Sequence, residues 1–163
     1  MIPFASRMRA RRFLLLAGGL LGAAGAAAAA AVAPAPEPSV TAEIAPASTS
    51  IYIGTVKLTV SPMTRQGNAY CSTYTAKVFP YFFYSETGQF RMEVSDADLF
   101  RLASGQAIDV VGDALRSDGV DRPVRAHAVP SSLADGQVKV RVVISPRLTL
   151  IFHTTYHLSG WQK

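Results

Sequence analysis

The chain has 163 residues and a formal net charge of +5 at pH 7; 49% of its residues are hydrophobic and 17% are charged. This length favours a single domain, because domains usually have roughly 100–200 residues. The composition excludes a disordered or collagen-like chain and a membrane protein with several spans. Four of the sixteen basic residues lie within the first twelve positions, so the charge gives no argument for a nucleic-acid partner.

Residues 1–31 have the three parts of a secretory signal peptide. Arginines between Arg7 and Arg12 form a positive region, residues 13–22 form an apolar region, and an alanine tract ending at Ala31 offers small-residue cleavage sites. Cleavage after Ala31 leaves 12 basic and 11 acidic residues. We therefore expect an exported chain, periplasmic or extracellular, with no stable membrane span after cleavage. The adjacent Arg11 and Arg12 leave twin-arginine export open as an alternative to the general secretory route.

Residues 32–50 are rich in proline, alanine and serine and contain few large apolar side chains. This composition predicts a flexible, extended leader. The folded domain is then expected to span residues 51–163, and its length of about 110 residues is sufficient for one modest core.

From residue 51 onward, runs of β-branched and aromatic residues are separated by turns that contain glycine, proline or aspartate. This pattern predicts an all-β fold, an antiparallel sandwich or small barrel of about seven strands. The expected strands are residues 51–60, 70–84, 89–94, 106–116, 120–129, 138–144 and 148–158. Two of them alternate clearly: Phe90, Met92 and Val94 share one face, and Val138, Val140, Val142 and Ile144 share another.

One short helix is expected over Asp96–Ser104. Ser95 is a suitable N-cap, acidic residues follow it at the positive end of the helix, and Gly105 suits a left-handed stop. We expect Leu99, Phe100 and Leu102 to plug one end of the β-structure. Because Asp96 and Asp98 lie at a helix start, capping explains them better than metal binding does.

Residues that could carry chemistry are few. Cys71 is the single cysteine, so it forms no intrachain disulfide and is best explained as a small buried side chain. His153 and His157 lie four positions apart on an expected strand, about 13 Å, which is too far to bind one metal ion. His127 could approach one of them across the sheet. The sequence predicts no metal site and no cofactor.

Motifs for nucleophilic or metal-dependent catalysis are also missing from the sequence. Ser72, Asp109 and His153 could converge as a triad, and Glu86 with Glu93 could serve as paired acids, but chains of this size offer such sets by chance. Whether the protein is an enzyme is left open, with a non-catalytic role favoured.

The most unusual segment is residues 78–84, which is aromatic on both faces of an expected strand. One interpretation is a central strand that is covered on both sides. The other is an exposed aromatic strip that binds a sugar ring or a protein. The candidate ligand-binding residues are Tyr81, Phe82, Phe83 and Tyr84, with Tyr156 and Trp161 as secondary candidates.

These features favour an exported, non-catalytic binding or accessory module of the cell envelope, with an envelope protein or a glycan as its partner. Two alternatives are a small envelope hydrolase and a structural subunit of an oligomeric assembly. The subunit would associate through edge strands at residues 51–60 or 148–158.

Overall fold

The computed structural model describes residues 40–160, which form one β-domain. The expected signal peptide and Trp161 lie outside the described residues. Ten strands, one α-helix and one short 3-10 helix make up the described part of the chain. In chain order these are β1 (Thr41–Ile44), β2 (Ala47–Ile51), β3 (Gly54–Val60), β4 (Met63–Gln66), β5 (Ala69–Phe79), η1 (Phe82–Tyr84), β6 (Glu86–Glu93), α1 (Asp96–Ala103), β7 (Ile108–Arg116), β8 (Asp121–Pro130), β9 (Asp135–Ser145) and β10 (Leu148–Ser159).

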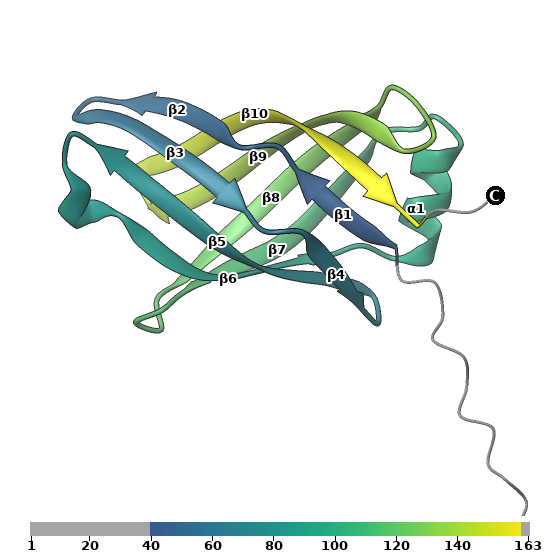
Figure 1. Ribbon diagram of the computed structural model, residues 1–163, viewed down its shortest axis with the longest axis horizontal. Coiled ribbons are helices and arrows are strands. Elements are labelled where there is room, and N and C mark those ends of the chain that lie inside the picture. Colours follow the sequence, from purple (N-terminus) through teal and green to yellow (C-terminus); the bar gives the residue numbers. More distant parts are fainter. Residues whose placement is uncertain (1–39, 161–163) are drawn as a thin grey trace, which may run out of the picture. The chain divides into compact units, whose positions relative to one another are not determined.

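Eight of these strands close into an antiparallel barrel. The hydrogen-bonded order is β5-β4-β1-β10-β9-β8-β7-β6, and the pairing of β6 with β5 closes the ring. Strands β2 and β3 continue beyond the ring, with β3 paired to the C-terminal half of β5 (Figure 1). The predicted all-β fold is confirmed. A barrel describes it better than a sandwich, because one sheet closes on itself.

Every second side chain along each barrel strand points inward, and these side chains form the barrel interior. Phe90, Met92, Val138, Val140 and Val142 are buried as the alternation predicted. Outward positions on the same strands are exposed and mostly polar or charged. One continuous apolar cluster therefore forms the core.

The predicted start of the domain is wrong. Residues 41–51, assigned to the flexible leader or to the first strand, form β1 and β2. Strand β1 pairs with both β4 and β10 and thereby closes the ring. The alternation of apolar and polar residues is weak here, because the two strands are short, are separated by Pro46 and consist mainly of small residues. Ala47 is nevertheless buried and Ile44 packs against the core.

Helix α1 begins at Asp96, as predicted, and ends at Ala103, one residue earlier than predicted. The Ser95 hydroxyl accepts a hydrogen bond from the Asp98 amide, and the Asp98 carboxylate accepts one from the Ser95 amide. Leu99 and Leu102 are buried, whereas Phe100 is 71% exposed. The prediction that Phe100 plugs the barrel is therefore wrong, because a step of about 100° per residue turns it away from the face shared by Leu99 and Leu102.

The antiparallel order gives the barrel two different ends. Helix α1 lies across the end at the right of Figure 1, where strands β6 and β7 are connected. The connections β2–β3, β5–β6, β7–β8 and β9–β10 lie at the opposite end. Neither helix among residues 40–160 is long and apolar enough to cross a membrane.

Candidate functional site

The aromatic segment forms an exposed turn at the end of the barrel opposite α1. Strand β5 leaves the sheet at Phe79, a cis peptide bond joins Phe79 to Pro80, and η1 follows. The predicted strand over residues 70–84 is therefore wrong in its last five residues. The turn is held by its own backbone, with the Tyr84 amide donating to the Tyr81 carbonyl at 3.1 Å and the Ser85 amide donating to the Phe82 carbonyl at 3.0 Å.

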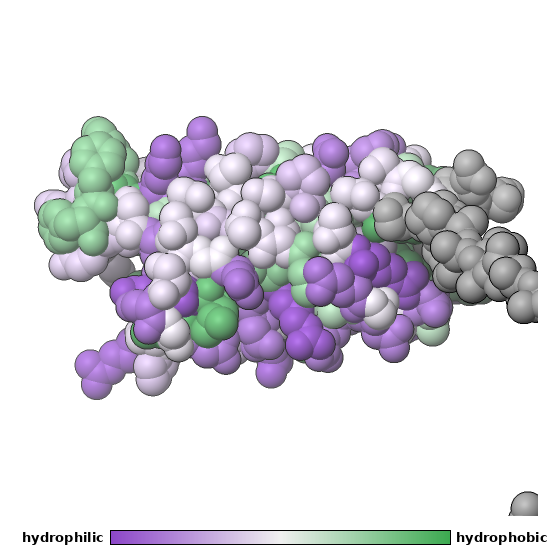
Figure 2. All heavy atoms as spheres, turned by 60° about the horizontal axis from the view of Figure 1, so that its bottom comes forward, coloured by the Kyte–Doolittle hydropathy of each residue, from purple (hydrophilic) through white to green (hydrophobic). Residues whose placement is uncertain are grey.

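All five aromatic side chains of this turn are exposed. Phe82 and Phe83 are 66% and 75% exposed, and Phe79, Tyr81 and Tyr84 are exposed between 42% and 63%. The neighbouring β2–β3 turn adds Tyr52 and Ile53, which are also exposed. We call these seven residues the aromatic end. Figure 2 shows the main hydrophobic group of that view at the left of the molecule, where both turns lie in Figure 1.

The rings of the aromatic end pack against one another rather than into the core. Phe79 and Phe82 lie edge to face with centroids 5.8 Å apart, and Tyr81 and Phe83 have the same centroid distance. Phe83 and Tyr84 are closer, at 4.5 Å. These contacts organise the aromatic surface without covering it, so the interpretation as a covered central strand is wrong and the rings are exposed.

Three exposed cationic side chains lie near the aromatic end or at the same end of the barrel. Lys57 and Lys77 lie directly opposite each other on β3 and β5, on the same outer face as Phe79 and two residues from it. Arg147 lies exposed in the β9–β10 turn. Two like charges directly opposite each other are unfavourable, and neither lysine has an ion-pair partner within residues 40–160.

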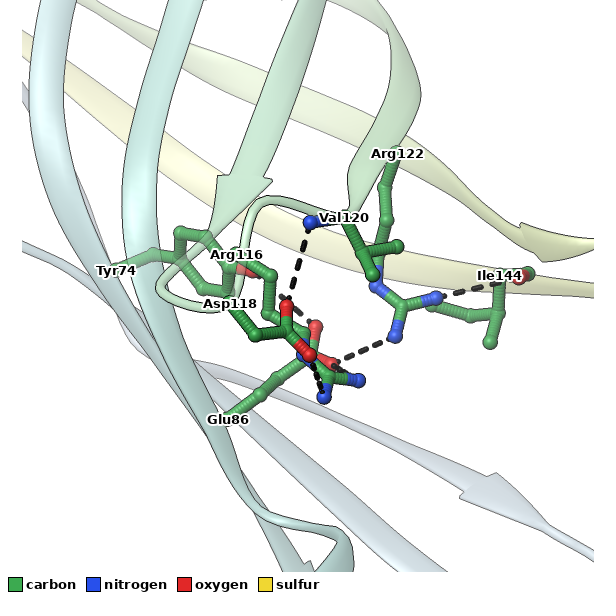
Figure 3. Close-up of polar contacts among 7 residues, drawn as sticks. All are labelled: Tyr74, Glu86, Arg116, Asp118, Val120, Arg122 and Ile144. Carbon is green, nitrogen blue, oxygen red and sulfur yellow. Dashed lines mark hydrogen bonds and ion pairs between the residues drawn. The ribbon is translucent and has the colours of Figure 1, made fainter.

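A partly buried polar cluster lies at the same end of the barrel (Figure 3). The Glu86 carboxylate, on β6, accepts a hydrogen bond of 2.7 Å from the Arg122 guanidinium and one of 3.2 Å from the Tyr74 hydroxyl. Arg116 lies 3.7 Å from the same carboxylate and also pairs with Asp118. Arg122 donates further to the Ile144 carbonyl at 3.2 Å.

This cluster has a structural role. Burial, together with the charge of Glu86, raises the pKa of Tyr74 to about 12, so its hydroxyl keeps its proton and donates to the carboxylate. Each charge in the pair of Glu86 and Arg122 is met by an opposite charge. The cluster joins β5, β6, β7, β8 and β9 beneath the aromatic end, and its two carboxylates, Glu86 and Asp118, are both paired with arginines.

Of the secondary candidates, Tyr156 does not belong to the aromatic end. Tyr156 is buried inside the barrel, where strand β10 faces β1 and β9 toward the α1 end. Trp161 lies outside the described residues. Of the six predicted ligand-binding residues, the structure brings together Tyr81, Phe82, Phe83 and Tyr84.

The groups proposed for catalysis lie apart. Asp109 pairs with His127 at 2.8 Å on the outer face, while the Ser72 hydroxyl donates to the Ser61 carbonyl. His153 and His127 lie opposite Lys139 on either side of β9, two strand spacings apart, which is about 10 Å. Within residues 40–160, no three histidine, cysteine, aspartate or glutamate side chains are grouped to hold a metal ion.

Sequence interpretation missed several residues of this end. Tyr52 and Ile53 were placed inside a strand, although Gly54 right after them marked a turn. Glu86 and Arg122 were not recognised as partners, although the alternation that buries Phe90 and Val124 also turns these two charges inward. Comparison with protein-family models, with curated proteins and with solved structures finds no match.

Proposed function

We propose that the chain is an exported, non-catalytic binding module of the cell envelope, which docks its aromatic end on an anionic lipid surface. The observation that carries this proposal is the exposure of Phe79 and Tyr81–Tyr84 at one end of a closed barrel. Fully burying one such side chain contributes about 1.5–3 kcal/mol. An aromatic group of this size is kept in water only at a cost, which contact with a partner removes.

The mixture of side chains fits a lipid surface better than it fits a protein pocket. Tyrosine has an apolar ring and a polar hydroxyl, and it prefers the boundary between lipid headgroups and acyl chains. The phenylalanines Phe82 and Phe83 lie at the tip of the turn and are the most exposed rings of the segment. Shallow insertion of the turn would place these two rings among the acyl chains and the tyrosine hydroxyls among the headgroups.

The charges favour an anionic surface. Lys57 and Lys77 are exposed two positions from Phe79 along the paired strands, and Arg147 is exposed in a turn at the same end of the barrel. Each such cation near an anionic leaflet contributes about 1 kcal/mol. The carboxylates of Glu86 and Asp118 at this end are ion-paired with arginines. Asp121, the first residue of β8, is exposed and has no ion pair within residues 40–160.

The test is flotation of the exported, purified chain with vesicles of phosphatidylcholine alone or mixed with phosphatidylglycerol. We expect binding to the mixed vesicles and weaker binding to the neutral ones. The double variant Phe82→Ser with Phe83→Ser should lose most of this binding. The matched control is Phe100→Ser, which removes an equally exposed phenylalanine at the α1 end and should bind as the unchanged chain does.

Other outcomes identify other partners. Vesicle binding that survives the double variant contradicts docking through the aromatic end. A chain that binds neither vesicle type but is retained on a purified envelope glycan would show that the lipid proposal is wrong. If the double variant also abolishes that retention, the aromatic end binds sugar.

A further inference from the structure

The outer wall formed by β8, β9 and β10 carries a group of basic side chains midway along the strands. Alternation along each strand turns these side chains outward. Because β9 lies across the ring from β5, this wall is on the other side of the barrel from Lys57 and Lys77. We call the group the cationic face; it consists of Arg125, His127, Lys139, Arg141 and His153.

The strand register places these side chains in two rows across the wall. Arg125 lies directly opposite Arg141, and in the next outward row Lys139 lies between His127 and His153. Neighbours within a row are one strand spacing apart, about 4.8 Å, and the two rows are about 6.7 Å apart. A groove of about 420 Å³ lies over β7, β8 and β9 at these rows, and it is lined by Arg125, His127, Lys139 and Arg141.

The cations of this face are not neutralised by ion pairs. Arg125, Lys139 and Arg141 have no ion-pair partner in the described part of the chain. Like charges directly opposite each other on neighbouring strands are unfavourable, and Arg125 and Arg141 are such a pair. An anion bound between the rows would relieve this repulsion.

Carboxylates are scarce around the cationic face. On β8, β9 and β10 they lie only at the first residues of strands, Asp121 and Asp135. On the neighbouring strand β7, Asp109 pairs with His127 at 2.8 Å and Asp113 lies opposite Arg91. An anion that approaches the two rows therefore meets more attraction than repulsion.

The spread of the cations favours a linear polyanion. A single polyvalent ion needs cationic groups that converge on one point, whereas these groups are distributed over three strands. Singly charged groups along a chain suit such a distribution better. A planar bilayer meets the convex wall of a barrel along a narrow line, while a chain can follow the groove between the rows.

The composition of the face favours a sugar chain over a protein or a nucleic acid. Protein interfaces are depleted of charged residues at their centre, and the centre of this face is charged. Single-stranded nucleic acids stack their bases on aromatic side chains, and the outward positions of β8, β9 and β10 carry no phenylalanine, tyrosine or tryptophan. Arginine binds carboxylates through paired hydrogen bonds, so acidic sugars are complementary to this surface.

We propose that the cationic face binds a linear acidic polysaccharide that carries carboxylates on successive sugar units. The chain would cross β8 and β9 between the two rows, with carboxylates accepting hydrogen bonds from Arg125 and Arg141 on one side and from Lys139 on the other. This site lies on the wall of the barrel, so it stays open when the aromatic end is docked, and the inference does not depend on that docking.

The experiment is isothermal titration of the full exported chain with galacturonic acid oligomers. We expect saturable binding that weakens as salt is added, because salt screens exposed charges. Replacing Arg125 and Arg141 together by glutamine should weaken the affinity roughly tenfold, the effect of losing two exposed ion pairs. The matched control replaces Lys57 and Lys77 by glutamine, another directly opposite cationic pair, and should leave the affinity nearly unchanged.

Several results would overturn the proposal. Equal losses in the two double variants would mean that the oligomers respond to net charge alone, and equal affinity for the galacturonic acid monomer would mean a site for a single anion. Tighter binding of a glutamate oligomer of equal charge would identify an acidic protein segment as the partner. The variant Phe82→Ser with Phe83→Ser should bind the oligomers as the unchanged chain does, and a loss there would place the sugar site at the aromatic end.

Discussion

The two ends of the barrel differ in whether their large apolar side chains are buried or exposed. At the α1 end, an amphipathic helix buries Leu99 and Leu102 and covers the core, and Phe100 is its single exposed aromatic side chain. At the aromatic end, a turn exposes a group of aromatic side chains above a partly buried polar cluster. Apolar side chains at the first end mostly cover the core, whereas those at the second end remain exposed, and this difference is the basis of the proposed docking.

The two ends also differ in their charged side chains. At the α1 end, Asp96 is ion-paired with Arg65, Glu93 lies 4.0 Å from Arg91, and Asp98 caps the helix. At the aromatic end, the cations Lys57, Lys77 and Arg147 are exposed. A barrel with these two ends would orient itself on an anionic surface with the aromatic end toward it and α1 away from it.

The largest expected effect comes from breaking the polar cluster. Arg122→Ala removes the main partner of the largely buried Glu86 carboxylate, while Arg116 and Tyr74 remain beside it, and we expect a loss of about 1.5–3 kcal/mol in the free energy of unfolding. Urea unfolding measures it. Arg91→Ala, which removes an exposed arginine 4.0 Å from Glu93, should change stability by no more than about 0.5 kcal/mol. Similar losses in both variants would show that the cluster does not hold this end.

The next largest effect is expected on vesicle binding, and it compares cations near the aromatic end with cations on the side of the barrel. Replacing Lys57 and Lys77 together by glutamine should weaken binding to anionic vesicles by about 30-fold, since each lysine contributes about 1 kcal/mol. The stability should stay level or rise, because the like-charged pair is removed. The matched control replaces Arg125 and Arg141, another directly opposed pair, by glutamine. Equal loss of binding in both double variants would mean that the barrel docks on its side.

A smaller effect is expected at the α1 end. Ser95→Ala removes the N-cap of α1 and should cost about 1 kcal/mol in urea unfolding. Binding to vesicles should not change, because α1 lies at the far end of the barrel. A change in vesicle binding with this variant would contradict the assignment of separate roles to the two ends.

The smallest effect depends on pH. Hydrogen bonds from His157 and Ser132 lower the pKa of Asp135 below its usual 3.8. A lowered pKa in the folded state means stabilisation that is present above pH 3.8 and lost as the pH falls through the lowered value. The urea midpoint of the unchanged chain should exceed that of Asp135→Asn at neutral pH, and the two should converge in acid. A gap that does not depend on pH would contradict this assignment.

The sequence predicted the parts of the fold that follow from local rules. The cap at Ser95, the stop at Gly105 and the alternation from Val138 to Val142 all depend on neighbouring residues. Closure of the barrel does not, because β1 pairs with β10 across more than one hundred positions. A short strand of small residues becomes recognisable only through its two partners.

The candidate site was predicted in composition but not in shape. Tyr81–Tyr84 attracted attention as a run of aromatic residues, yet alternation cannot assign faces where every position is apolar. The structure shows a turn instead of a strand, and it adds Tyr52 and Ile53 from a segment about thirty positions away. Tyr156, by contrast, is buried because it alternates inward with Leu158.

The most direct test of docking compares single tryptophan probes at the two ends. Trp161→Phe removes the chain's only tryptophan, and Phe83→Trp or Phe100→Trp then places one at the aromatic end or on α1. With phosphatidylglycerol vesicles, the account predicts that the emission of the residue 83 probe shifts to shorter wavelength and is quenched by brominated acyl chains, while the residue 100 probe is unaffected. Quenching at residue 100 without quenching at residue 83 would contradict it.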